Sequence, residues 1–514
     1  MEQEKPAAPP VIPPVPKSFK LLGHNYVTPD LVAKVTGRAK YAEDFRAEGM
    51  VFIKLMPSPR PHARVVSIDA SAALAMPGVH GMITADDLPA PPPPPGGPPA
   101  AAPPAKKADS ADNPPPAKKA SGAAAGAVAG VQGAPPPAGT PTAPATPPAA
   151  APPAAPPMPA EFALTKEPVY EGEPILAIAA DTEELAAEAI DRIVVTFEPL
   201  PHVIDPLDSL RPGGPDGRTQ GNIFVGPSMR TLKWTAADME LVDQGKFPKD
   251  AEAAETLSFG DIEKGFAEAD LIVERDMQQQ TTSHQPLESR SAMAYWQNGK
   301  CHLHVSTQSL ARTVAAVAGW VGIKPEELVL ISEYTGGGFG SKIPGAQSMA
   351  IPALMSKKLN GRPVMMRISR AEETYIGRVR PGYQGWIKMG FKKDGRVTAI
   401  DTFIVEASGP YRRQGDHSTT ANLGSLLFQP ANMRFRGISV ATNTPPGVSQ
   451  RAPGGLQASV WYEPLVAEAA RKLGIDELAI HKLNAPEGQA QFGVAADGLD
   501  SSGEEDRRGV SDGQ

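Results

Sequence analysis

The sequence has almost no cysteine and no excess of basic residues. A single cysteine, Cys301, among 514 residues excludes a disulfide framework. It also excludes an iron–sulfur cluster held by this chain alone, since such clusters usually need four cysteines. Fifty Lys and Arg against 57 Asp and Glu leave a net charge of −7. The chain therefore lacks the general positive field that a nucleic-acid partner would require.

Targeting and membrane segments are also missing from the sequence. No stretch approaches the roughly 18 apolar residues that a membrane helix needs. The first 20 residues are rich in proline and contain neither an apolar signal region nor a twin arginine. We therefore expect a cytoplasmic protein that has no membrane span and no nucleic-acid partner.

The most unusual stretch is residues 334–342, Tyr-Thr-Gly-Gly-Gly-Phe-Gly-Ser-Lys, which follows an apolar run at 328–331 that predicts a buried strand. Closely spaced glycines permit positive φ or a close approach of the backbone to a ligand. That ligand is often an anion held by backbone N–H groups. The stretch is not a P-loop, because Ser341 precedes Lys342 where that loop has glycine, and the dinucleotide fingerprint also fails at Ser341. A tight turn between strands is the alternative.

Composition separates three segments from the rest of the chain. The leader at 1–19, a Pro/Ala-rich insertion at 89–160 and a Gly-rich acidic tail at 488–514 contain few large apolar side chains. Such segments bury too little apolar surface to offset the entropy of ordering, so we expect all three to be disordered. We interpret the insertion as a tolerated surface loop, with a docking arm for a partner as the alternative.

Apolar patterns predict an α+β fold for the remaining residues. We expect a small α+β domain at 20–210, interrupted by the insertion, then a polar connector at 211–256 and a larger mixed region at 257–487. Predicted strands lie at 50–56, 64–68, 79–83, 174–180, 193–197, 292–296, 302–306, 328–331, 363–369 and 440–444, with a hairpin over 386–404. Predicted helices lie at 310–320, 346–359 and 456–473, and another follows Asp181 as its N-cap.

Several stretches together resemble the molybdopterin-binding large subunit of the xanthine dehydrogenase, aldehyde oxidase and carbon monoxide dehydrogenase family. They occur in the family's order at 34–41, 58–64, 170–174, 197–201, 283–288, 306–308, 336–342 and 451–454. The resemblance covers nearly everything outside the leader, the insertion and the tail. It implies a small α/β-hammerhead-like domain followed by a larger mixed α+β molybdopterin-binding domain, of which this chain has the first half only.

The resemblance also implies a reaction. Members of the family use a molybdenum centre held by molybdopterin to insert water-derived oxygen into a small aldehyde or an aromatic heterocycle. The cofactor supplies this chemistry, while the protein binds and orients the reactants. We therefore expect molybdenum–molybdopterin, with the cytosine dinucleotide form as one option, and partner subunits that carry iron–sulfur clusters and FAD. A non-catalytic scaffold or cofactor-insertion relative of the same fold is the alternative.

The predicted cofactor-binding residues lie in the glycine stretch and just after the strand predicted at 302–306. By resemblance, Gln308 would donate its amide to an oxo ligand of molybdenum, with a surface amide as the alternative. Backbone N–H groups of Phe339 and Gly340, in the run with Gly337 and Gly338, would face the oxygens of the metal and the pterin phosphate region.

Three further residues are expected near the site. Arg451 matches an arginine near the metal, with a solvated surface arginine as the alternative, and Ala452 replaces the glycine that follows it in the family. Glu288 is expected to be a structural carboxylate near the site. We expect no direct metal ligand and no catalytic residue on this chain.

Departures from the family pattern narrow the expected chemistry. Besides Ser341, which replaces a glycine, Ile343 stands where purine-oxidising members carry a glutamate, which argues against xanthine as substrate. Residues 415–418 occupy the place of the loop that carries a cysteine in true carbon monoxide dehydrogenases, and Cys301 lies far from it, so a copper–molybdenum site is not expected.

Nothing after Asn484 resembles the second cofactor-binding half, which holds the general-base glutamate. We therefore expect a second chain to supply that half and its glutamate.

Overall fold

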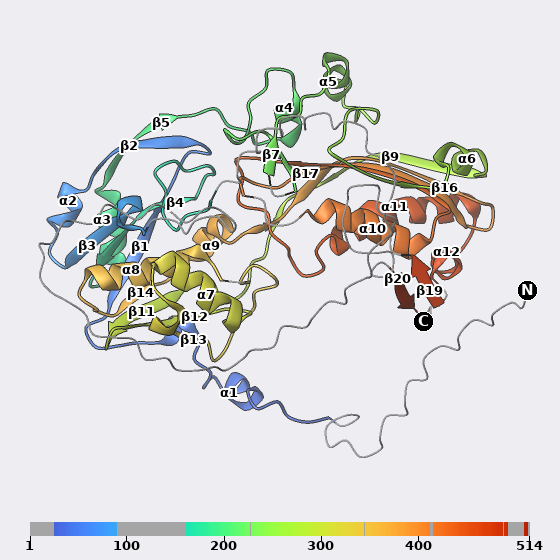
Figure 1. The fold of residues 1–514 in the computed structure, drawn as a ribbon. Coiled ribbons are helices and arrows are strands. Elements are labelled where there is room, and N and C mark those ends of the chain that lie inside the picture. Colours follow the sequence, from blue (N-terminus) through green and yellow to red (C-terminus); the bar gives the residue numbers. More distant parts are fainter. Residues whose placement is uncertain are drawn as a thin grey trace, which may run out of the picture. The chain divides into compact units, whose positions relative to one another are not determined.

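Two β-sheets of seven strands each carry the fold of the described residues (Figure 1). This computed structural model describes residues 25–89, 160–226, 228–343, 345–411 and 415–486, and the backbone of 488–491 and 508–511. The leader and nearly all of the insertion and tail lie outside the described residues. The mixed helix and strand content, with a hammerhead domain before a larger domain, confirms the predicted α+β class.

The first sheet combines strands from both predicted domains. Its order is β13 (Leu328–Ile331), β12 (Lys300–Val305), β11 (Ala292–Gln297), β14 (Val364–Met366), β1 (Val51–Pro57), β4 (Pro174–Ala180) and β3 (Val79–Thr84). The pairs β12–β13 and β1–β14 are parallel, and Val51 lies opposite Val364. Every residue of β4 is buried, which explains why its sequence is a continuous apolar run.

The second sheet is built from the C-terminal part of the chain and from the expected connector. Its order is β7 (Ser228–Arg230), β6 (Ile223–Val225), β18 (Asn432–Val440), β17 (Val397–Ala407), β16 (Gly382–Phe391) and β9 (Leu271–Gln279), and β8 (Glu255–Phe259) also pairs with β18. Three two-stranded sheets join β2 (Ala63–Asp69) to β5 (Val194–Pro199), β10 (Thr282–Ser283) to β15 (Val379–Arg380), and β19 (Gly488–Gln491) to β20 (Arg508–Ser511).

Helices pack on both sheets. The α-helices of the described residues are α1 (Leu31–Val35), α2 (Ser71–Leu74), α3 (Glu183–Asp191), α4 (Pro206–Leu210), α5 (Ala236–Asp243), α6 (Ile262–Ala267), α7 (Leu310–Val321), α8 (Ala350–Lys358), α9 (Arg370–Ile376), α10 (Asp416–Phe428), α11 (Gly455–Leu473) and α12 (Glu477–Asn484). Apolar residues of α7 and α8 pack on the first sheet, and those of α10 and α11 pack on β16, β17 and β18. Figure 1 shows α10 and α11 lying along β16.

Four sequence predictions need correction. The stretch 211–256 is not a polar connector: it contains β6, β7, α5 and the start of β8, and its scattered apolar residues, such as Trp234, form a core with β17 and β18. Because these residues occur singly and without periodicity, the pattern did not reveal them. The strand predicted at 440–444 ends at 440 instead, and the helix after β4 is capped by Thr182, whose side chain accepts from the Leu185 N–H, rather than by Asp181.

The fourth correction concerns the tail, in which two four-residue segments pair as the strands β19 and β20. Composition predicts only whether side chains can form a core, and backbone pairing between two short segments does not need a core.

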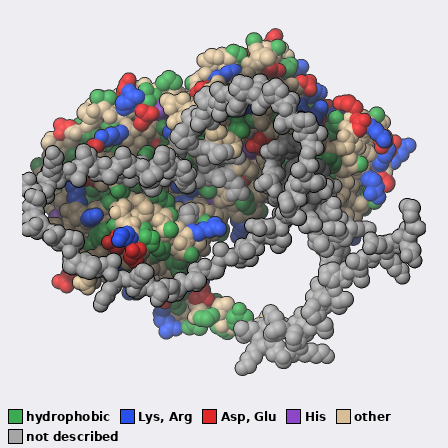
Figure 2. Space-filling model, viewed as in Figure 1, with side chains coloured by type: hydrophobic (Ala, Val, Ile, Leu, Met, Phe, Trp, Pro, Cys, Tyr) green, Lys and Arg blue, Asp and Glu red, His purple; other side chains and the backbone are tan. Residues whose placement is uncertain are grey.

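Among the described residues, no helix combines the length and the apolar character needed to cross a membrane. On the face drawn in Figure 2, positively and negatively charged side chains are interspersed over the part not covered by grey atoms.

Candidate functional site

The glycine stretch and Gln308 meet because their strands are parallel neighbours. Gln308 follows β12 and the stretch follows β13, so both leave the sheet at the same edge. Backbone and side-chain hydrogen bonds hold the two segments together: the Gln308 N–H donates to the carbonyl of Lys342 (3.2 Å), and the Thr335 hydroxyl donates to the carbonyl of Thr307 (3.0 Å). Residues 335–343 therefore form one wall of a site, which we call the glycine wall.

Gln308 is bound to the glycine wall through one end of its amide. Its Oε1 accepts from the backbone N–H of Gly340 at 2.8 Å and of Lys342 at 3.3 Å. A Cβ atom at Gly338 would lie 2.4 Å from this oxygen, so only glycine allows the contact. The Nε2 group has no hydrogen-bond acceptor among the described residues, and it remains available to a ligand.

The expected role of the Gly340 N–H needs correction. We expected this group to face the oxygens of a bound metal, but in the structure it donates to Gln308. The cause is the backbone conformation, since Phe339 has φ of 55° and Gly340 has φ of 109°, which turns the intervening peptide toward Gln308. An anion at this wall would thus meet the Gln308 amide rather than the Gly340 N–H.

The opposite side of the site is formed by residues 448–453, which we call the second wall. The Arg451 N–H donates to the carbonyl of Phe339 at 2.7 Å, and the Arg451 guanidinium lies over the Phe339 ring at 5.2 Å from its centroid. A Cβ atom at Gly340 would lie 2.2 Å from the carbonyl oxygen of Ser449. Ala452 has φ of 59°, a conformation that the family's glycine would adopt at lower cost.

Buried charges support the glycine wall from behind. Arg290 is fully buried, pairs with the equally buried Glu373, and donates to the carbonyl of Ser341 at 3.1 Å. Glu288 accepts from the Gly336 N–H at 2.5 Å and lies 3.7 Å from the ammonium of Lys342. The carboxylate of Glu288 thus orders the loop and does not line the site.

Lys342 faces the protein interior rather than the site. Its Nζ donates to the carbonyl of Glu288 at 2.7 Å and to the hydroxyl of Ser306 at 2.8 Å. Burial lowers the pKa of Lys342 to about 8, although the negative charge of Glu288 opposes this change. Because its three donors point inward, this lysine cannot act as the phosphate-binding lysine of a P-loop.

A cleft of about 790 Å³ lies between the two walls. It brings together Gln308, Gly337, Gly338, Phe339, Gly340 and Arg451, all of which the sequence predicted for one site, and it is completed by Arg312, Thr335, Ile343, Val448, Ser449, Gln450 and Pro453. Sequence reasoning missed Arg312, because at the start of an amphipathic helix it resembles any solvent-facing arginine. It also missed Val448–Gln450, which have no distinctive residue pattern.

The residues of the cleft fit an anionic cofactor. The free amide end of Gln308 supplies hydrogen-bond donors. Arg312 and Arg451 add two positive charges to the lining. No carboxylate lines the cleft, so an anion would meet no repulsion from the described lining residues.

Residues 415–418, expected to form a loop, instead begin α10 and bury two titratable groups. Asp416 accepts from Gln457, and His417 lies against Glu406 and Glu255 of the second sheet. Burial opposes the positive charge of His417, but the carboxylates of Glu406 and Glu255 outweigh it and raise the pKa of His417 to about 10. Burial, with the charge of Glu406, raises the pKa of Asp416 to about 6. Nothing in the pattern Gly-Asp-His-Ser indicated that these side chains would be buried.

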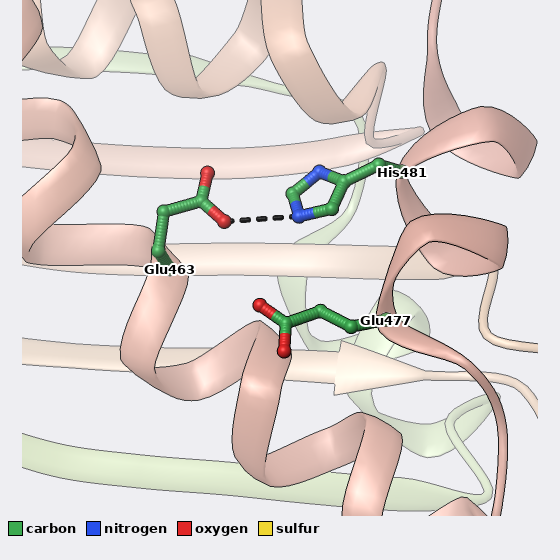
Figure 3. A group of neighbouring side chains, drawn as sticks. All are labelled: Glu463, Glu477 and His481. Carbon is green, nitrogen blue, oxygen red and sulfur yellow. Dashed lines mark ion pairs between the residues drawn. The ribbon is translucent and has the colours of Figure 1, made fainter.

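A further group of titratable side chains lies apart from the cleft lining. Glu463 on α11 points toward Glu477 and His481 on α12, and His481 Nε2 lies 3.0 Å from a carboxylate oxygen of Glu463 (Figure 3). Glu477 is exposed and the other two are half-buried. Glu463 and His481 form an ion pair between the two helices, and none of the three residues lines the cleft.

Comparison with known proteins agrees with this fold. The family profile of the molybdopterin cofactor-binding domain matches residues 246–485, and that of the a/b hammerhead domain of aldehyde oxidase and xanthine dehydrogenase matches residues 36–105. The chain therefore contains a molybdopterin cofactor-binding domain after an a/b hammerhead domain. The chain belongs to the family of xanthine dehydrogenase and aldehyde oxidase, as its sequence motifs predicted.

Two curated relatives and one solved structure illustrate the match. The chain is 26% identical to the probable hypoxanthine oxidase of Escherichia coli K12 over 92% of this chain and 45% of that protein. It is 25% identical to the nicotinate dehydrogenase large molybdopterin subunit of Eubacterium barkeri over 91% of this chain and 90% of that subunit. The aldehyde oxidoreductase of Desulfovibrio gigas has the same fold, with a TM-score of 0.63 and 22% identity over 89% of this chain and 43% of that one. The chain thus spans less than half the length of the first and third of these proteins.

Proposed function

We propose that this chain forms one side of the cofactor site of a multi-subunit molybdenum hydroxylase. The observation that carries the proposal is the cleft in which Gln308, the glycine wall and Arg451 converge. When bound, molybdopterin with its molybdenum supplies the redox chemistry that transfers oxygen from water to a small aldehyde or an aromatic heterocycle. Electrons would leave through iron–sulfur and FAD subunits, and a cytoplasmic location remains a prediction.

The residues of this chain would bind and orient the cofactor. The Nε2 group of Gln308 would donate to an oxygen on the metal, and Arg451 and Arg312 would balance negative charge on the pterin and its phosphate. The glycines allow the cofactor to rest against the main chain. Among the described lining residues there is no carboxylate, so the general base would come from a second chain.

One observation supports a second chain that closes the cleft. The nicotinate dehydrogenase subunit that matches this chain over 90% of its own length is named a large molybdopterin subunit. Phe339 in the lining and Leu456, three residues after the second wall, are 37% and 48% exposed and would lie on the surface that such a chain covers.

The proposal is tested by the molybdenum content of the purified complex. We expect close to one molybdenum per complex, together with pterin. Gly340→Ala should abolish both, because its Cβ would meet the Ser449 carbonyl at 2.2 Å. Gly299→Ala is the matched control: Gly299 also has positive φ, but a Cβ there meets nothing within 4 Å, so only backbone strain changes and the content should stay normal. A wild-type complex without molybdenum would refute the proposal and favour a scaffold or cofactor-insertion relative.

A further inference from the structure

Arg380 lies behind the second wall and binds it through its whole guanidinium. The side chain is 2% exposed. It donates to the side chain of Gln450 (2.9 Å), the carbonyl of Arg451 (2.7 Å), the carbonyl of Ala452 (3.1 Å) and the side chain of Gln457 (2.7 Å). A planar guanidinium has five N–H groups in fixed directions, so it can satisfy these four acceptors in one geometry.

The charge of Arg380 is balanced through an amide. Among the described residues no carboxylate accepts directly from this guanidinium. Gln457 accepts from Arg380 and donates to the Oδ2 atom of Asp416 at 2.9 Å. Asp416 is fully buried, and its other oxygen has no hydrogen-bond partner among the described residues. Gln457 therefore links a buried cation to a buried acid.

The second wall depends on this network because its backbone conformation is unfavourable. Ala452 is held at positive φ, which a side chain rarely adopts without compensation. The carbonyls of Arg451 and Ala452 point inward to Arg380, so removing the guanidinium would leave both without a charged donor. The Arg451 side chain, which lies over Phe339, is attached to the same turn.

We infer that Arg380 is a positioning residue for the cleft: it fixes the turn at 450–452 so that the Arg451 guanidinium stays over Phe339. The inference rests on the proposed function, because the consequence of positioning Arg451 is retention of an anionic cofactor. Arg380 does not line the cleft and acts through the turn at 450–452, which brings Gln450 and Arg451 to the lining. A lysine keeps the charge but cannot replace the planar fork that spans four acceptors.

The test is a double-mutant cycle on the complex, read out as molybdenum and pterin per folded complex. Arg451→Met and Arg380→Lys should each lower cofactor content about tenfold, whereas Arg380→Lys should add less than twofold in the Arg451→Met background. Arg436→Lys is the matched control, since Arg436 is also largely buried but binds Asp401 on the second sheet. It should leave the content unchanged.

Hydrogen exchange of the same variants provides a readout that does not depend on the cofactor. Arg380→Lys should speed amide exchange at residues 449–456, while Arg436→Lys should not. The inference is overturned if a molybdenum-loaded wild type and Arg380→Lys have equal cofactor content, if exchange at 449–456 is unchanged, or if the two substitutions lower content independently. A wild-type complex without molybdenum would instead refute the proposed function, and the two failures are thus distinguishable.

Discussion

The two walls of the cleft are both held by buried arginines, but their charges are balanced differently. Arg290 behind the glycine wall touches the carboxylate of Glu373, and both side chains are fully buried. Arg380 behind the second wall reaches Asp416 only through the amide of Gln457. A direct buried pair tolerates little change because either partner alone is an uncompensated charge. In the bridged pair, Asp416 can gain or lose a proton. We therefore expect the second wall to tolerate changes of its charged residues better than the glycine wall does.

The largest expected effect is on the glycine wall. Arg290→Met would leave the Glu373 carboxylate buried without its partner and the Ser341 carbonyl without its donor. We expect the free energy of unfolding to fall by about 3–5 kcal/mol, measured by urea denaturation. Replacing both members, as in Arg290→Met with Glu373→Leu, should recover part of this loss. If the single variant lost less than about 1 kcal/mol, the contrast between the walls would be wrong.

A smaller effect, dependent on pH, is expected at the second wall. Burial raises the pKa of Asp416 to about 6, so the folded state binds its proton more tightly than the unfolded state does. The contribution of this group to the free energy of unfolding therefore falls as pH rises from about 4 to about 6. Asp416→Asn should remove a change of about 2 kcal/mol across this window. Denaturation curves of both proteins at pH 4 and pH 6.5 measure it, and parallel behaviour would contradict it.

The smallest expected effect concerns Ala452. Because this residue has φ of 59°, Ala452→Gly should raise the free energy of unfolding by up to about 1 kcal/mol. Ala467→Gly inside α11 is the control, where the same change should destabilise by about 1 kcal/mol. Thermal unfolding of the two variants should shift in opposite directions. A loss of stability for Ala452→Gly would show that the turn is not strained.

Sequence reasoning predicted the parts of the site that depend on local chemistry. The closely spaced glycines predicted positive φ or a close backbone approach, and in the structure Gln308 and the Ser449 carbonyl lie against Gly338 and Gly340. Gln308 and Arg451 could be named only through the family resemblance, because an isolated glutamine or arginine has no distinctive pattern. The expected role of the Gly340 N–H was wrong because the direction of a peptide depends on φ at Phe339, which composition does not specify.

The supporting residues could not be predicted because their partners are distant in sequence. Arg290 meets Glu373 across 83 residues, and Arg380 meets Gln457 across 77. Charged residues are normally exposed, so the sequence gives no reason to place either arginine in the interior. The same limitation explains the connector at 211–256, whose single apolar residues reach a core formed by β17 and β18.

The pairing of β14 with β1 in the first sheet has a practical consequence for truncation. A fragment ending near residue 210 would contain β1 but not β14, and the main-chain donors and acceptors of Val51–Ile53 would lose their neighbour. An uncovered strand edge of this kind recruits other chains. Expression of the hammerhead region by itself should therefore yield self-associating material, whereas a fragment that extends through Met366 would retain the missing neighbour.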